Sequence, residues 1–305
     1  MITKYELKKN LPFEIKEKMA KQRIREWYDY WRGRVYISFS GGKDSTVLLH
    51  LVRSLYYDVP AVFCNTGQEF PEIIKFVKTF DNITWIKPQK SFKEIINNYG
   101  YPIISKEVSQ KIYEYRRTKS EKVKFNLTIP HKTKNLKDKI VLSFKWHKLL
   151  KTNFKISDKC CHFLKKQPFY LYEKETDNKA ILGIRAKESR MRLYNYNKNG
   201  CNAFGKRPIS APLSVWNDDD IAKYIEKHNI QICNIYNNYS RTGCMGCGFG
   251  VHLEKQPNRF QLLERTHPIH WNYFINYLGY RELFEFLNIP YRNELTLFEN
   301  IEIKK

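Results

Sequence analysis

The chain has 305 residues and a formal net charge of +23, and 42% of its residues are hydrophobic. That apolar content supports an ordinary buried core and excludes a chain that is disordered throughout. No apolar run approaches the roughly 20 residues that cross a bilayer, and the first residues contain no hydrophobic signal core. We therefore expect a soluble, cytoplasmic protein with no membrane partner, built as one large domain or two smaller ones.

Strands and helices are predicted to alternate along much of the chain. The predicted strands are short apolar runs, which lie at 34–39, 61–64, 83–86 and 180–184. The predicted helices have apolar residues at helical spacing, a Pro in the first turn or acidic residues at the start, and they cover 1–31, 45–57, a segment from Pro71 and 218–228. This alternation indicates an α/β fold with a doubly wound parallel sheet.

We divide the chain into five segments by composition and pattern. They are an N-terminal helical segment (1–31), the first part of the α/β core (32–105), a lysine-rich insertion or lid (106–158), the second part of the core (159–230) and a Cys-rich C-terminal helical region (231–305).

The positive charge is concentrated in the middle of the chain. Between Lys106 and Lys166 there are 18 Lys or Arg and 5 Asp or Glu, interleaved with aromatic residues. Basic side chains neutralise phosphates and aromatic faces stack on bases, so a nucleic acid or another polyanion is a reasonable partner. The alternatives are a lysine-rich solvated surface for the charge and core packing for the aromatic side chains.

A glycine-rich turn between the first predicted strand and the next helix has the features of a phosphate site. It consists of Ser40, Gly41, Gly42, Lys43, Asp44 and Ser45. The two glycines let the backbone come close to an anion, and the free N–H groups of the following helix point at the same place. The spacing is not that of the Walker motif. A glycine turn without a ligand is the alternative.

The turn resembles the pyrophosphate loop of the N-type ATP pyrophosphatase superfamily, which has the adenine nucleotide alpha hydrolase-like fold. The resemblance implies that residues 40–45 hold the phosphates of ATP with Mg²⁺, and that Lys43 and Asp44 are catalytic. Three further blocks, at 65–72, 183–192 and 208–221, resemble the phosphoadenylyl-sulfate (PAPS) and adenylyl-sulfate (APS) reductases of that superfamily. The resemblance covers roughly residues 34–250.

These blocks add candidate nucleotide-binding residues. In the related reductases the basic side chains of the second block face the anionic end of the nucleotide. The resemblance therefore implies a catalytic role for Arg185, and nucleotide-binding roles for Thr66, Gly67, Gly183, Arg185 and Arg190. Surface arginines with no ligand are the alternative for the basic residues.

Seven cysteines are present, and an odd number argues against a disulfide framework. Cys244 and Cys247 form a Cys-x-x-Cys loop rich in glycine, and Cys160 and Cys161 are adjacent. A zinc site is one alternative, although adjacent cysteines suit it poorly. A redox dithiol would need only Cys244 and Cys247, and an iron–sulfur cluster uses four thiolates and tolerates unusual spacings. The order of the two pairs resembles the 4Fe–4S site of bacterial adenylyl-sulfate reductases, which implies that these four cysteines are the metal ligands.

The other three cysteines have separate predictions. Cys64 follows a buried apolar run and is expected in the core. Cys201 and Cys233 remain candidates for a sulfur carrier or a spare ligand.

One feature of the reductases is absent. They resemble one another in a nucleophilic Cys near the C-terminus, whereas the last Cys here is Cys247. The leading hypothesis is therefore a PAPS reductase-like ATP pyrophosphatase that adenylates tRNA or DNA for sulfur transfer, with a cysteine desulfurase as sulfur donor. The second is a PAPS or APS reductase that uses an internal Cys and a thioredoxin-like reductant. The third is a non-catalytic sensor that binds nucleotide and nucleic acid.

Overall fold

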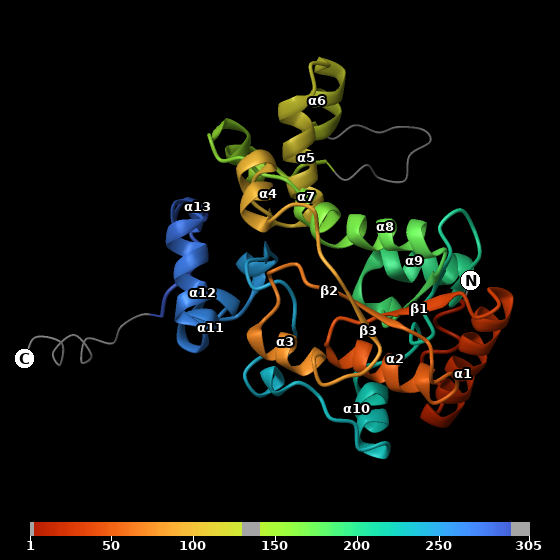
Figure 1. The fold of residues 1–305 in the computed structure, drawn as a ribbon. Coiled ribbons are helices and arrows are strands. Elements are labelled where there is room, and N and C mark those ends of the chain that lie inside the picture. Colours follow the sequence, from red (N-terminus) through yellow and green to blue (C-terminus); the bar gives the residue numbers. More distant parts are fainter. Residues whose placement is uncertain (1–2, 130–140, 294–305) are drawn as a thin grey trace, which may run out of the picture. The chain divides into compact units, whose positions relative to one another are not determined.

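The computed structural model describes residues 3–129 and 141–293, so part of the lysine-rich stretch, 130–140, lies outside the described residues (Figure 1). The chain forms two compact units. Unit 1 consists of Met1–Gln89 and Lys165–Gly243, and unit 2 consists of Lys90–Leu164 and Cys244–Lys305. Within the described ranges, no helix combines the length and the apolar composition that crossing a membrane requires.

Unit 1 is built on a six-stranded sheet in the order β3-β2-β1-β5-β7-β6. Its strands are β1 (Val35–Ser38), β2 (Ala61–Cys64), β3 (Ile83–Ile86), β5 (Lys179–Leu182), β6 (Asn202–Ala203) and β7 (Ile209–Ser210). Every neighbouring pair is parallel except β6 with β7. The predicted α/β fold with a doubly wound, mostly parallel sheet is confirmed.

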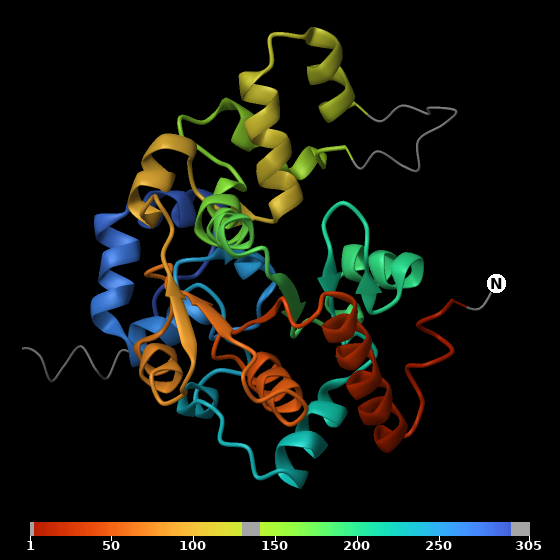
Figure 2. The same cartoon turned by 45° about the vertical axis from the view of Figure 1, so that its right-hand side comes forward.

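Helices cover both faces of this sheet. They are α1 (Phe13–Tyr30), α2 (Lys43–Arg53), α3 (Pro71–Val77), α8 (Gln167–Thr176), α9 (Arg190–Asn199) and α10 (Asp218–Lys227). Tyr172 of α8 packs against Tyr36, Val62 and Ala180 of the strands, which fixes α8 on one face. Figure 1 shows α2 and α10 on the other side of the strands, and Figure 2 shows α1 beside α2.

Two predicted helices differ from the structure at their ends. The helix predicted over 1–31 begins only at Phe13, because Pro12 takes the N-cap position, where its missing N–H costs nothing. The helix predicted over 45–57 spans Lys43–Arg53 and ends when the chain turns at Ser54.

The centre of the sheet is the point where the strand order reverses. Strand β1 pairs with β2 on one side and with β5 on the other, and Ser38 lies opposite Leu182 in the β1–β5 pair. The loops that follow β1 and β5 therefore leave the same edge of the sheet side by side. In open α/β sheets, ligands bind in the crevice at this point.

Unit 2 combines short helices with a small parallel sheet. Its helices are α4 (Phe92–Tyr99), α5 (Lys106–Arg117), α6 (Glu121–Thr128), α7 (Lys159–Cys161), α11 (Arg259–Thr266), α12 (Pro268–Asn272) and α13 (Tyr280–Leu287). Strand β4 (Ile103–Ile104) pairs with β8 (Gly248–Phe249). Just before β4, Tyr101 forms a parallel bridge with Ile156.

Gly100 makes this arrangement possible. Its φ is +106°, and an added Cβ would lie only 2.1 Å from the carbonyl carbon of Lys155. No larger residue could let the two segments approach so closely. The chain around β4 thus has the segment that leads to Cys160 on one side and the segment that follows Cys247 on the other.

Candidate functional site

The turn at 40–45 is a compact loop at the start of α2. Gly41 has φ +71°, and Gly42 is the extended N-cap residue of the helix. The Ser45 hydroxyl donates to the carbonyl of Gly42 at 2.9 Å and accepts from the backbone N–H of Ser40 at 3.2 Å. These contacts close the loop directly before α2, so the N-terminal end of the helix dipole, which favours an anion, lies at the loop.

A cavity of about 590 Å³ opens over this loop. Its walls come from the loop, from the chain after β5 and from the N-terminal end of α10, together with the segment 236–242. Among the described lining residues are five Lys or Arg and three Asp or Glu, which are Lys43, Arg185, Lys187, Arg192, Arg241, Asp44, Glu188 and Asp218. The positive excess, added to the N-terminal end of α2, favours an anionic ligand.

Gly183 allows the chain after β5 to run directly beneath α2. A Cβ at this position would lie 2.9 Å from the carbonyl oxygen of Asp44 and 3.1 Å from the Cα of Ser45. The absence of a side chain therefore brings Arg185 next to the loop. Gly183 and Arg185, both predicted nucleotide-binding residues, line the same cavity as residues 40 and 42–45.

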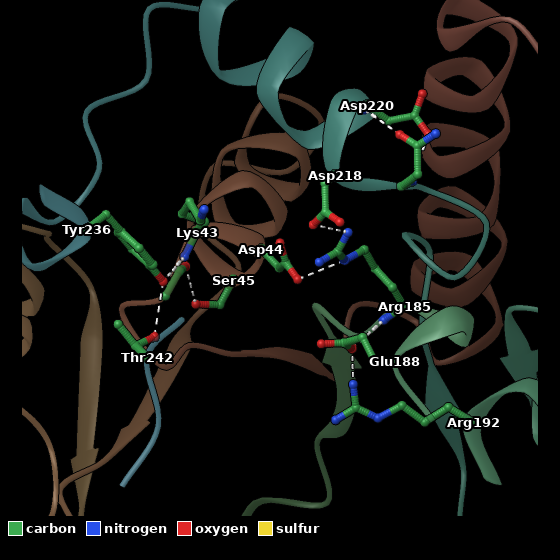
Figure 3. A network of polar contacts seen from close by, with 12 residues as sticks. Lys43, Asp44, Ser45, Arg185, Glu188, Arg192, Asp218, Asp220, Tyr236 and Thr242 are labelled. Atoms are coloured by element: carbon green, nitrogen blue, oxygen red, sulfur yellow. Dashed lines mark hydrogen bonds and ion pairs between the residues drawn. The ribbon is translucent and has the colours of Figure 1, made fainter. Parts of the chain in front are cut away.

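Arg185 is the centre of a network of charges (Figure 3). Its Nε lies 3.0 Å from Oδ2 of Asp44, and its Nη1 lies 2.8 Å from Oδ1 of Asp218 at the first position of α10. Its backbone N–H donates to Glu188 at 3.0 Å, and Glu188 in turn forms an ion pair with Arg192. The guanidinium is mostly buried, whereas Asp218 is exposed, so an anion in the cavity would compete with Asp218 for Arg185.

Asp44 lies in an environment that destabilises its ionised carboxylate. Burial raises the pKa of its carboxyl group, and the nearby guanidinium of Arg185 only partly offsets that effect. A carboxylate that is destabilised by burial is a good partner for a cation.

Tyr236, Thr242 and Arg192 are among the lining residues that were not predicted as site residues from the sequence. The hydroxyl of Tyr236 accepts from the backbone N–H of Lys43 at 2.9 Å and is 3.0 Å from Oγ1 of Thr242. The Nζ of Lys43 lies 4.7 Å from the centre of the Tyr236 ring. Burial lowers the pKa of the Arg192 guanidinium. Tyr236 and Thr242 have no local signature, because tertiary folding brings them to the loop.

Three other predicted residues lie elsewhere in unit 1. Arg190 is the first residue of α9 and is exposed, and it is Arg192 of the same helix that lines the cavity. The hydroxyl of Thr66 donates to Glu69 at 2.7 Å, within the turn where Gly67 has φ +71°. Neither Thr66 nor Gly67 is among the lining residues of the cavity over the 40–45 loop.

The four cysteines predicted as metal ligands all belong to unit 2. The Cys160 and Cys161 sulfurs are 4.0 Å apart. The contact with Cys161 and burial raise the pKa of the Cys160 thiol, and Cys247 and Cys244 contribute electrostatically in the same direction. The two pairs are thus brought into one another's electrostatic reach around Cys160.

The Cys-x-x-Cys loop is held by a buried aromatic cluster. An added Cβ on Gly246 would lie 2.4 Å from the ring of Phe274 and 2.8 Å from the ring of Phe92. The hydroxyl of Tyr280, which is fully buried, donates to the carbonyl of Gly246 at 2.7 Å. In the ranges 3–129 and 141–293, no group of three or more His, Cys, Asp or Glu has the arrangement that would hold a single metal ion.

The remaining cysteines lie in unit 1, and none of the seven is in a disulfide. Cys64 is buried in β2, at the position where the sequence places it in the core. Cys233 is also buried. Burial raises the pKa of the Cys201 thiol to about 11. A thiol with so high a pKa is mostly protonated near neutral pH, which disfavours a role as a nucleophilic sulfur carrier.

Comparison with solved structures finds distant likenesses. The phosphoadenylyl-sulfate reductase of Candida auris, solved as a phosphate complex, has a TM-score of 0.44 at 14% identity over 76% of this chain and 93% of that one. FMN adenylyltransferase of Candida glabrata has a TM-score of 0.42 at 14% identity, over 76% of this chain and 61% of that one.

Curated relatives match over short stretches. The uncharacterized protein MJ0973 of Methanocaldococcus jannaschii is 35% identical over 94 residues, which are 28% of this chain and 23% of that protein. The phosphoadenosine 5'-phosphosulfate reductase of Zymomonas mobilis is 33% identical over 64 residues, 21% of this chain and 26% of that enzyme. The matches thus span about a quarter of each relative.

The family model of the phosphoadenosine phosphosulfate reductase domain matches over a much longer range, at residues 34–105 and 103–248. That range includes the glycine loop after β1, the chain after β5 and both cysteine pairs. Since it takes in well over half of the sequence, the chain belongs to the phosphoadenosine phosphosulfate reductase domain family.

Proposed function

We propose that the protein is an ATP pyrophosphatase that adenylates a nucleic-acid acceptor and prepares it for sulfur transfer. The observation that carries the proposal is the cavity at the reversal point of the sheet, where the glycine loop, the N-terminal end of α2 and five basic residues converge. Membership of a family named for a nucleotide reductase supports an adenine nucleotide as the ligand.

Four residues of the cavity have proposed roles in this reaction. Lys43, Arg185 and the N–H groups of α2 would neutralise the phosphate chain of ATP. Asp44, with its costly buried charge, would hold Mg²⁺ together with phosphate oxygens. An oxygen of the acceptor attacks the α-phosphorus, the bond from that phosphorus to the bridging oxygen breaks, and pyrophosphate leaves with the electron pair. Arg192 would stabilise the charge that develops.

We propose that the thiol quartet of unit 2, Cys160, Cys161, Cys244 and Cys247, holds a 4Fe–4S cluster as a resident group. Four cysteines, two adjacent and two in a glycine-rich loop, supply the thiolate ligands that such clusters use. These four thiolates would hold the cluster, and exchange of one of them for sulfide would let it supply the sulfur. Displacement of AMP from the adenylated acceptor by sulfide changes no oxidation state, and a cysteine desulfurase with a thiol reductant is the class of enzyme that supplies sulfide.

The basic residues of unit 2 support a nucleic-acid partner. The side chain of Phe144 is 86% exposed, and an exposed ring of this kind could stack on a base. Not all basic residues of this stretch are free for phosphates. The guanidinium of Arg116 donates to the carbonyl of Thr152 at 2.7 Å and to those of Leu149 and Phe154, which ties α5 to the following segment.

A second candidate is a sulfonucleotide reductase. The family match and the Zymomonas mobilis relative favour it. In this reaction two electrons from a thioredoxin-like reductant reduce the sulfate sulfur of PAPS or APS to sulfite, and the adenine nucleotide is released.

Product analysis distinguishes the two reactions. With ATP, Mg²⁺ and a mixture of tRNA or DNA fragments, we expect pyrophosphate and an adenylated acceptor, from which added sulfide releases AMP, and we expect Lys43→Gln to lower the rate at least tenfold. Release of sulfite from PAPS or APS with a dithiol reductant, and no pyrophosphate from ATP, would instead establish the reductase. Cleavage of ATP to ADP and phosphate would contradict both.

A further inference from the structure

A second, smaller cavity adjoins the one over the glycine loop. Its volume is about 300 Å³, and Ile184, Arg185 and Arg192 line both cavities. One wall is the inner side of α9, and the other is the hairpin of β6 and β7, including Cys201 and Arg207. Nothing in the reaction described so far requires this second space.

The charges that line the second cavity are all positive. Arg185, Arg192 and Arg207 are its charged residues, and no Asp or Glu is among the described residues of its wall. The larger cavity, in contrast, contains Asp44, Glu188 and Asp218. Arg207 is exposed on the hairpin loop and has no ion-pair partner within the described ranges, so its charge is available to a ligand.

The titratable groups of the wall add no negative charge. Burial raises the pKa of the Cys201 thiol to about 11 and raises the pKa of the Tyr196 hydroxyl above its ordinary value. Both groups are therefore protonated near neutral pH. Arg192 lies in the electrostatic reach of Arg185, which lines the same cavity, and an anion between these two guanidinium groups would reduce their repulsion.

The wall is also held in place before any ligand binds. Ser210 donates to the side chain of Asn202 at 2.7 Å across the hairpin. The backbone N–H of Ala211 donates to the carbonyl of Cys201 at 2.8 Å. A preformed cationic cavity binds an anion without the entropic cost of ordering its walls.

We propose that this second cavity binds one phosphodiester group of the acceptor strand, next to the site of the ATP phosphates. The proposal rests on the proposed function and names the part of the acceptor that is recognised. A phosphodiester carries a negative charge that can pair with Arg207 and lies within reach of Arg185 and Arg192, whereas a neutral nucleobase would leave Arg207 unpaired. The volume of the cavity suits one such unit and its sugar rather than a duplex.

The test uses the full chain with α,β-methylene ATP in the first cavity. The probe is a thymidine dinucleotide with one phosphodiester, compared with its methylphosphonate analogue, which has the same shape and no charge. We expect the phosphodiester to bind at least tenfold more tightly than the methylphosphonate, and Arg207→Gln to remove about tenfold of its affinity. Lys206→Gln is the matched control, because Lys206 is the exposed neighbour of Arg207 and lines neither cavity.

Other results would overturn the proposal. Equal affinities for the charged and neutral dinucleotides would show that no phosphodiester is recognised. A different outcome is that Arg207→Gln weakens the binding of adenosine 3',5'-bisphosphate and leaves the affinity for the dinucleotide unchanged. That result would show that the cavity binds the nucleotide and not the acceptor. Because binding is measured without turnover, these results are separate from the release of pyrophosphate, which tests the proposed function itself.

Discussion

Gly183 shows how one missing side chain positions the cavity. A methyl group at this position would overlap the carbonyl of Asp44 at the start of α2. We expect Gly183→Ala to lower the free energy of unfolding by about 1–3 kcal/mol, because backbone must move to admit it, and to weaken ATP binding. Urea unfolding measures the first effect. Gly205→Ala is the control, since nothing lies within 4 Å of its Cβ position, and an equal loss in both variants would contradict the explanation.

His50 makes the stability of the folded protein depend on pH. Burial lowers the pKa of its imidazole from the ordinary 6.5, and His228 and Lys21 lower it further, against a smaller opposite effect of Glu17. The unfolded chain therefore binds a proton at a higher pH than the folded chain does. The stability that His50 contributes is present above pH 6.5 and is lost as the pH falls through the lowered value.

The variant His50→Gln removes this titration. Between about pH 7.5 and about pH 5.5, we expect the free energy of unfolding of the wild type to fall more steeply than that of His50→Gln. Urea unfolding at both pH values gives the comparison. Parallel slopes for the two proteins would mean that His50 titrates alike in the folded and unfolded chains.

At the level of single residues, the sequence predicts the glycine loop, Gly183 and Arg185 and misses other lining residues. The glycine loop is one contiguous motif, and a strand before it and a helix after it make its conformation predictable. Tyr236 and Thr242 reach the loop from almost 200 residues away in the chain, through contacts that no local pattern encodes. Arg192 rather than Arg190 faces the cavity, because the direction of α9 depends on how that helix packs.

Among the elements, α10 links the core to the cavity. Its N-terminal turn has a capping box between Asn217 and Asp220, and Asp220 also forms a buried ion pair with Lys16 of α1 at 2.6 Å. Two residues before Asp220, Asp218 contacts Arg185. The buried Lys16–Asp220 pair thus helps to fix the N-terminal turn of α10 and, with it, the position of Asp218 at the cavity.

Removing one partner of the Lys16–Asp220 ion pair should destabilise the folded protein. Lys16→Met leaves a buried carboxylate without its cation, and we expect it to lower the free energy of unfolding by about 3–5 kcal/mol. The double variant Lys16→Met with Asp220→Asn should recover part of that loss, since the uncompensated charge is gone. Chemical denaturation of the single and double variants measures both. A double variant less stable than Lys16→Met would contradict this account.

The elements themselves were predictable to different degrees. Strands β2 and β3 lie at the predicted residues, because each is a short apolar run between turns. Strands β6 and β7 have two residues each and were not predicted, since so short a segment has no periodicity to detect. Their pairing depends on the neighbouring strand β5, which only the folded sheet supplies.

In the whole molecule, each unit is assembled from two separate pieces of the chain. Composition marks no boundary near Gln89 or Gly243, because core residues lie on both sides. The two cysteine pairs are about 80 residues apart in sequence and belong to the same unit, which the spacing alone could not establish.

The thiol quartet is testable through the whole protein. After anaerobic purification, we expect iron and acid-labile sulfide in the wild type, with the broad absorption of a thiolate-bound cluster. Cys247→Ser should lose most of the iron, because one of four ligands is gone. Cys233→Ser is the control, since Cys233 is buried in unit 1. A colourless wild-type protein that contains zinc would contradict the cluster.

The central claim is that the phosphate chain of an adenine nucleotide binds in the cavity over the glycine loop. The most direct measurement is the dissociation constant of α,β-methylene ATP for the wild type, for Lys43→Gln and for Lys75→Gln, whose exposed lysine on α3 lies outside the cavity. We expect Lys43→Gln to weaken binding by about tenfold or more and Lys75→Gln to bind like the wild type. Equal affinities for all three proteins would contradict it.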